Sequence, residues 1–109
     1  MSKIEANLKN ILYAIDKIAS YTAEFNDAES FYNSQKSFDA VLMQFVVIGE
    51  AVGRLDSAFK EETSYIPWRE IKGFRNIIAH DYFGVDADEV WEIINQKIIP
   101  LQEEIKKLL

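Results

Sequence analysis

The apolar residues of this chain recur at spacings of three and four, and no segment alternates apolar and polar residues as a β-strand would. The pattern is clearest near the N-terminus, in Ile4, Leu8, Ile11, Leu12, Ile15 and Ile18. This spacing places the side chains on one face of an α-helix, and that face must be buried against another element. The sequence therefore predicts an all-α fold.

Four main helices with short links are predicted, arranged as an antiparallel four-helix bundle in a single domain, residues 1–109. They cover residues 3–23, residues 36–61, a segment that starts at Pro67 and ends before Phe83, and a segment from Asp86 to Leu108 that bends or restarts at Pro100. Ser2–Glu5, Asn26–Glu29 and Asp86–Glu89 have the pattern of capping boxes. The second of them predicts a short extra helical stretch over residues 27–33.

Composition limits the classes of function. The chain has no cysteine and one histidine, so a disulfide framework, a thiolate zinc site and an all-histidine metal site are excluded within one chain. We expect no metal, no cofactor and a reducing cytoplasm. No apolar run approaches the ~20 residues that cross a bilayer, and the N-terminus opens on a charged, amphipathic pattern, so we expect a soluble protein without membrane contact.

The net charge of −6 argues against non-specific attraction to nucleic acid, which comes from neutralising phosphates. Residues 54–75, however, hold five basic groups against four acidic ones. A small basic site on an acidic body is compatible with this distribution, whereas a broad nucleic-acid footprint is not.

The candidates for chemistry gather in residues 68–82, as Arg75, Asn76, His80 and Tyr82. Imidazole accepts and donates a proton near neutral pH, and guanidinium grips a phosphate with two parallel hydrogen bonds. Together they suit phosphodiester chemistry. The structural alternative is that a lone histidine near a helix end caps carbonyls or makes a structural hydrogen bond.

One helix does not bring these groups together. Its apolar stripe is predicted to be Ile71, Phe74, Ile77 and Ile78. Arg75 and His80 are five residues apart, which is about 140° around an ideal helix. Something other than this helix must therefore aim both side chains at one atom.

The middle of the second predicted helix, residues 41–48, is apolar almost all round. Two buried faces indicate either a subunit interface or packing within the chain, and periodicity does not separate the two. Gly49 and Gly53 indicate close approach of another backbone. Glu50, which is costly to bury unpaired, is expected at a groove edge or beside a cation such as Arg54.

Other polar and aromatic residues have simpler explanations. Trp68 and Trp91 have neighbours on apolar stripes and are expected to fill the core rather than stack on bases. A carboxylate cluster, Asp81, Asp86, Asp88 and Glu89, suits a divalent cation, but helix capping explains the last three. There is no glycine-rich phosphate loop and no serine triad.

Several motifs in order resemble the HepT-like branch of the HEPN family, over nearly the whole chain. They are Ile48-Gly49-Glu50-Ala51, Ile66-Pro67-Trp68, Gly73-Phe74-Arg75-Asn76, His80-Asp81-Tyr82 and Val90-Trp91. The family signature is arginine, a polar residue, three further residues, histidine, any residue and tyrosine. Residues 75–82 match it without departure.

The resemblance implies an all-helical homodimer whose two signature motifs face one cleft. Family members of this kind are metal-independent ribonuclease toxins, usually encoded beside a minimal nucleotidyltransferase antitoxin that can transfer AMP to the signature tyrosine. Carried over, Arg75 and His80 would be catalytic, Asn76 would support them, and Tyr82 would be the modified residue.

The expected mechanism has His80 draw the proton from a ribose 2′-OH, while Arg75 stabilises the charge on the attacked phosphate. The second subunit's histidine would protonate the leaving 5′-oxygen. RNA is then the substrate and DNA is not. The rival hypothesis is a non-catalytic dimeric HEPN binding module that docks and positions a nucleotidyltransferase.

Overall fold

The computed structural model describes residues 2–109, and every regular element in that range is helical. The elements are α1 (Lys3–Thr22), α2 (Ala28–Asn33), α3 (Gln35–Arg54), α4 (Ser57–Glu62), α5 (Trp68–His80), the 3₁₀ turn η1 (Tyr82–Gly84), α6 (Ala87–Gln96) and α7 (Ile98–Lys107). The all-α prediction is confirmed, as are the extra helical stretch at α2 and the first helix to within one residue.

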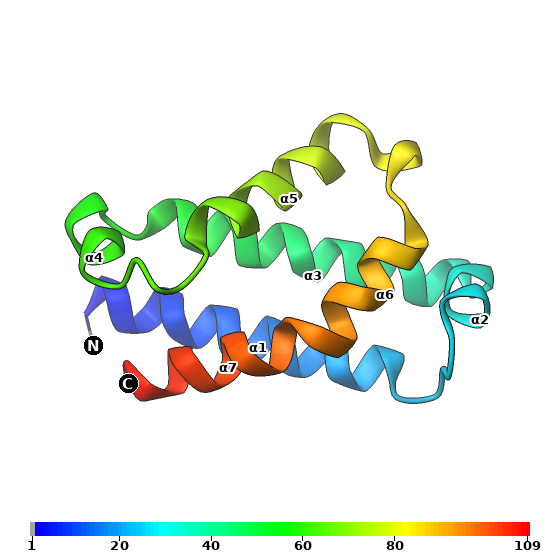
Figure 1. Ribbon diagram of the computed structural model, residues 1–109, viewed down its shortest axis with the longest axis horizontal. Coiled ribbons are helices and arrows are strands. Elements are labelled where there is room, and N and C mark those ends of the chain that lie inside the picture. Colours follow the sequence, from blue (N-terminus) through cyan, green and yellow to red (C-terminus); the bar gives the residue numbers. More distant parts are fainter. Residues whose placement is uncertain (1) are drawn as a thin grey trace.

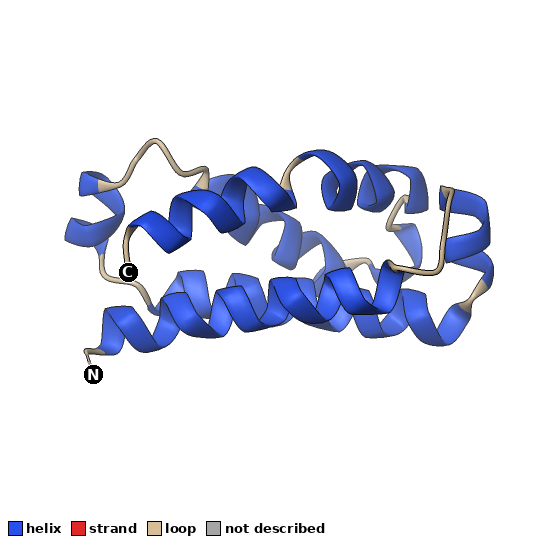
Figure 2. Cartoon of the chain, turned by 90° about the horizontal axis from the view of Figure 1, so that it is seen from below, coloured by secondary structure: helices blue, strands red, loops and turns tan. Residues whose placement is uncertain are grey.

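The two longest helices, α1 and α3, lie side by side and run in opposite directions along the long axis of the molecule (Figures 1 and 2). Helix α5 packs on α3, while α6 and α7 return along the other side, with α6 against α2 and α7 against α1. The buried residues of α1 and α3 form most of the core, chiefly Leu8, Ile11, Ile15, Ile18, Val41, Leu42, Ile48 and Val52.

The prediction of one long helix over residues 36–61 is wrong in one respect, because two helices, α3 and α4, occupy this range. Helix α3 ends at Arg54, and Leu55 is extended, with ψ of 136°. The Asp56 carboxylate then accepts a hydrogen bond of 3.0 Å from the backbone N–H of Phe59 and starts α4. Asp56 is therefore an N-cap, and the apolar spacing that continues through Leu55 and Phe59 hid the break.

The last predicted helix restarts as expected, but at Lys97 rather than at Pro100. Pro100 has no N–H to donate to Gln96, and its ring would collide with the carbonyl of that residue, where α6 ends. Pro100 instead lies in the first turn of α7, where its missing N–H is not needed.

Side-chain caps fix most of the other helix starts. The Ser2 hydroxyl accepts from Glu5 N–H at 3.0 Å, and the Asp86 carboxylate accepts from Asp88 N–H at 2.9 Å. Helix α2 is capped by Asp27 rather than Asn26. Hydrogen bonds from Ser30 lower the pKa of the Asp27 carboxyl. Pro67 is the N-cap of α5, so this helix begins at Trp68 and not at Pro67 itself.

Aromatic packing closes the two ends of the molecule. Phe31 is fully buried, and its ring centroid lies 5.3 Å from that of Phe38 and 5.5 Å from that of Trp91, which joins α2 to α3 and α6. Trp68 is buried too, and its indole N–H donates to the Thr63 hydroxyl at 2.9 Å. Trp68 thus packs in the core, as predicted, and Trp91 is partly buried and packs against the core. Within residues 2–109, no helix combines the length and apolar character needed to span a membrane.

Candidate functional site

Three of the four predicted site residues lie on α5, and Tyr82 follows in η1. Helix α5 is unbroken and is attached to α3 by its buried side, where Ile78 is buried and the Phe74 ring meets the Phe45 ring edge-on with centroids 5.1 Å apart. Ile77, predicted to belong to the apolar stripe, is instead half exposed. The position of Arg75 is therefore set by how α5 rests on α3.

Gly49 and Gly53 allow α5 to approach α3. A Cβ at Gly49 would overlap the Arg75 side chain, with Cγ only 2.6 Å away, and a Cβ at Gly53 would lie 2.8 Å from the Lys72 amine. The atoms close to these glycines are therefore side-chain atoms of the same chain, and not the backbone of another element as predicted. They provide space for two cationic side chains of α5.

The Arg75 guanidinium is fixed by two contacts. One terminal nitrogen lies 2.5 Å from a Glu50 carboxylate oxygen, and the other donates to the Asn76 amide oxygen at 3.0 Å. Arg75 Nε and that Glu50 oxygen are buried without a well-directed hydrogen bond, so the contact is an ion pair by distance alone. Both side chains remain partly exposed, which limits the stability it adds. Its main effect is to orient Arg75.

Glu50 is therefore paired with Arg75 on the next long helix and not with Arg54, the local partner suggested by the sequence. This ion pair explains why a carboxylate occurs in the most apolar part of α3. It faces the cation for which Gly49 makes room.

The Tyr82 hydroxyl donates a hydrogen bond to the Asp39 carboxylate on α3, which also accepts from the Gln35 amide at 2.9 Å. Partial burial is the largest cause, and the Asp39 carboxylate the second, of a rise in the pKa of Tyr82 to about 12. Tyr82 is therefore a protonated donor at neutral pH, and it ties η1 to the first half of α3.

His80 is the last residue of α5, and its side chain is exposed. Among residues 2–109, the imidazole makes no hydrogen bond and no ion pair, so neither the capping nor the structural hydrogen bond of the alternative hypothesis is found. On an ideal helix Asn76 lies about 100° from Arg75 and about 40° from His80. Asn76 therefore lies on the side of the helix that carries His80 and accepts a hydrogen bond from Arg75. No hydrogen bond joins Arg75 to His80 within residues 2–109.

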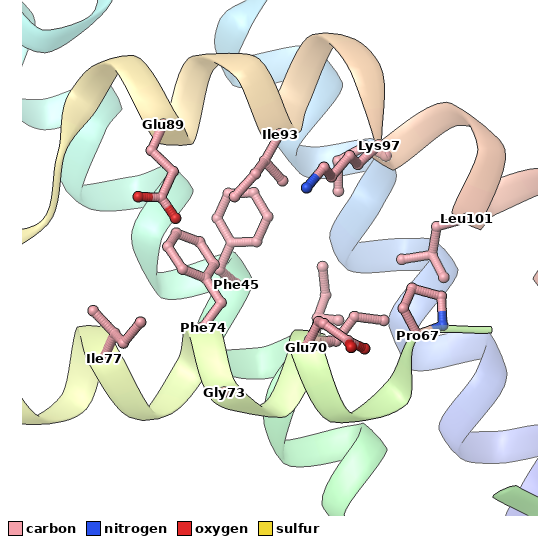
Figure 3. Close-up of a pocket in the computed structure, with 13 residues that line it drawn as sticks. Phe45, Pro67, Glu70, Gly73, Phe74, Ile77, Glu89, Ile93, Lys97 and Leu101 are labelled. Carbon is pink, nitrogen blue, oxygen red and sulfur yellow. The ribbon is translucent and has the colours of Figure 1, made fainter. Parts of the chain in front are cut away.

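A separate groove lies between α5 and the α6–α7 segment, with α3 as its floor (Figure 3). Its volume is about 570 Å³, and its lining is mainly apolar: Phe45, Ile48, Pro67, Ile71, Phe74, Ile77, Ile93, Ile98 and Leu101. Figure 3 shows Glu70 on α5 and Glu89 and Lys97 on the opposite wall. Because carboxylates outnumber cations there, the groove does not suit an RNA backbone. None of the four predicted site residues lines it.

Asp39 is the site residue that sequence reasoning missed. It is 43 positions from Tyr82 and has no local pattern that marks it. Glu50 was recognised as unusual, but its partner required tertiary packing. Among the described residues, no group of three or more histidine, aspartate or glutamate side chains is placed to hold a metal ion.

The fold and the site define a helical protein in which an arginine, held by a glutamate and an asparagine, precedes an exposed histidine on the same helix. A family model described as "HepT-like: Ribonuclease HepT-like" matches residues 11–108. The chain belongs to this ribonuclease family, as the signature indicated.

Curated relatives agree with this assignment. "Putative RNase MJ0125" of Methanocaldococcus jannaschii is 36% identical over 106 residues, covering 97% of this chain and 90% of its own. "Probable ribonuclease HepT" of Thermococcus cleftensis is 35% identical over 101 residues, covering 93% and 91%. "Gamma-glutamylcyclotransferase and putative RNase MJ0434" of M. jannaschii is 36% identical, and this chain spans 47% of its length. No solved structure matches the chain.

Proposed function

We propose that this protein is a metal-independent endoribonuclease toxin that acts in the cytoplasm at a cleft formed across a homodimer and is neutralised by a minimal nucleotidyltransferase antitoxin. The observation that carries the proposal is the arrangement on α5. Arg75 is oriented by Glu50 and Asn76, while His80 on the same helix is exposed and has no partner among residues 2–109. A charged, positioned phosphate ligand and a free acid–base group are what RNA cleavage needs.

In this mechanism, His80 of one subunit takes the proton of a ribose 2′-OH, whose oxygen attacks the adjacent phosphorus. The developing charge on the phosphate oxygens is stabilised by Arg75. His80 of the partner subunit donates a proton to the 5′-oxygen as its bond to phosphorus breaks, leaving a 2′,3′-cyclic phosphate. DNA lacks the nucleophile and stays intact, and no step requires a metal.

The exposed side of α3 supports the homodimer. Met43 and Val47 are 58% and 37% exposed although they belong to the most apolar part of the chain. Residues 43, 47, 50 and 54 share one face of a helix, so this apolar strip adjoins the Glu50 carboxylate that holds Arg75. A second copy packed on the strip by a two-fold axis would bring both signature helices to one cleft.

The proposed neutralisation acts at Tyr82 by AMP transfer. The Tyr82 oxygen attacks the α-phosphorus of ATP, pyrophosphate leaves, and the proton now shared with Asp39 is released. The added phosphate brings negative charge next to the signature helix. RNA is then repelled and cleavage stops. Intact-mass spectrometry after incubation with ATP and the nucleotidyltransferase should show AMP on the parent and none on Tyr82→Phe. Equal modification of that variant would rule out Tyr82.

A second candidate is a non-catalytic module that docks a nucleotidyltransferase. The apolar groove between α5 and α6–α7 favours it, because such a groove can accept apolar side chains of a protein partner. In that case His80→Ala would have no functional effect.

The deciding experiment is an RNA cleavage assay on the parent, Arg75→Ala, His80→Ala and the control Arg69→Ala. Arg69 is an exposed cation of the same helix, so its removal makes the same charge change as Arg75→Ala. We expect both signature variants to lose cleavage with unchanged circular dichroism, while Arg69→Ala and a chelator leave it intact. Parental rates in either signature variant would exclude the proposed role of that residue.

A further inference from the structure

Phe83 is the most exposed large apolar side chain of the described chain, at 99%. It lies in η1, directly after Tyr82 and three residues after His80. Three Cα-to-Cα steps span at most about 11 Å, so the backbone of Phe83 lies within that distance of the His80 backbone. A phenylalanine ring wholly in water gains no free energy from burial, and no other part of the described chain covers it.

The turn that carries Phe83 is held in place. Gly84 N–H donates to the Asp81 carbonyl at 3.0 Å, and Val85 N–H donates to the Tyr82 carbonyl at 3.3 Å. The Tyr82 hydroxyl is bonded to Asp39, and the Tyr82 ring meets the Phe83 ring edge-on, with centroids 5.7 Å apart and planes at 81°. Phe83 is thus presented outward by an anchored turn, which lowers the entropy cost of binding through it.

We propose that Phe83 is a stacking platform for a base of single-stranded RNA beside the scissile phosphodiester. The inference rests on the proposed ribonuclease function. Aromatic side chains stack unpaired bases of any sequence, and the contact does not depend on charge. A chain with net charge −6 gains little affinity from phosphate neutralisation, so base stacking is a binding contribution that remains open to it.

The test uses Phe83→Ala, Phe83→Leu and Phe83→Trp, each also combined with His80→Ala for binding measurements. The probe is a short single-stranded RNA with one 2-aminopurine, whose fluorescence is quenched by stacking. Removal of a stacked aromatic should weaken binding roughly 5- to 150-fold. We expect Phe83→Ala and Phe83→Leu to raise KM and Kd by this factor with kcat near the parental value, and Phe83→Trp to restore binding and quenching.

The control measurements separate stacking from other roles of an exposed aromatic. Melting temperatures should stay unchanged, because Phe83 packs against no core residue. Phe83→Leu binding RNA as tightly as the parent, or unaltered binding by Phe83→Ala, would overturn the proposal. Light scattering that shows a dimeric parent and a monomeric Phe83→Ala variant would also overturn the proposal, because Phe83 would then be a residue of the subunit interface. Because quenching is read with the His80→Ala protein, it decides the stacking proposal even if the parent cuts no RNA.

Discussion

Gly49→Ala tests how the position of Arg75 is built. The new Cβ would overlap Cβ and Cγ of Arg75, so α5 must lift away from α3 or Arg75 must leave Glu50. Overpacking of this kind costs about 1–3 kcal/mol, and replacing a helical glycine by alanine returns about 1 kcal/mol. The expected change is a loss of up to about 2 kcal/mol in the free energy of unfolding, with loss of RNA cleavage.

Two matched substitutions isolate the steric cause. At Gly73 a Cβ meets nothing within 4 Å, so Gly73→Ala should raise the free energy of unfolding by about 1 kcal/mol. At Gly53 the nearest atom is the end of the flexible Lys72 side chain, which can move aside. Gly53→Ala should therefore also be neutral or stabilising.

Denaturant unfolding followed by circular dichroism gives all three values, and a cleavage assay accompanies it. Gly49→Ala as stable and as active as Gly73→Ala would refute the packing of α5 on α3 described above. The ordering of the three variants matters more than any single value, because all three share the same helix-propensity gain.

Three further outcomes follow from contacts of the core and the site. Thr63→Val leaves the buried indole N–H of Trp68 without its acceptor, and urea unfolding should show a loss of about 1–3 kcal/mol; an unchanged midpoint would mean that this hydrogen bond is not formed. Phe31→Ala removes a fully buried ring and should cost about 3–5 kcal/mol in the same assay. Tyrosinate absorbance should show Tyr82 ionising near a pKa of about 12, and Asp39→Asn should lower that pKa. Since the folded pKa of Tyr82 exceeds the unfolded value of about 10, its stabilising effect is complete below about pH 10 and is lost as the pH rises toward 12; a parental Tyr82 that titrates near 10 would contradict the bond to Asp39.

The sequence predicts the helices well because spacing and capping are local signals. Ser2 and Asp86 cap helices where predicted, and the last helix restarts as predicted, although at Lys97 rather than at Pro100. The break at Asp56 was missed because apolar residues keep helical spacing across it. An N-capping aspartate there was nevertheless visible in the sequence.

The site is less predictable, because its contacts join segments that are distant in sequence. Local spacing suggested Arg54 as the partner of Glu50, whereas packing supplies Arg75. The glycine pair indicated a close approach, but sequence does not say whether the approaching helix belongs to the same chain. Asp39 belongs to the site because the fold brings α3 and η1 together.

The central claim is a single cleft that uses His80 of both subunits, and mixed dimers test it most directly. Parental protein and His80→Ala protein are denatured together, refolded at varied ratios and assayed for RNA cleavage, with Arg69→Ala in place of His80→Ala as the control. If both histidines are needed, activity follows the square of the parental fraction, so an equal mixture keeps about one quarter of the parental rate. A linear fall, with about one half remaining in the equal mixture, would contradict the composite cleft and assign catalysis to each chain alone.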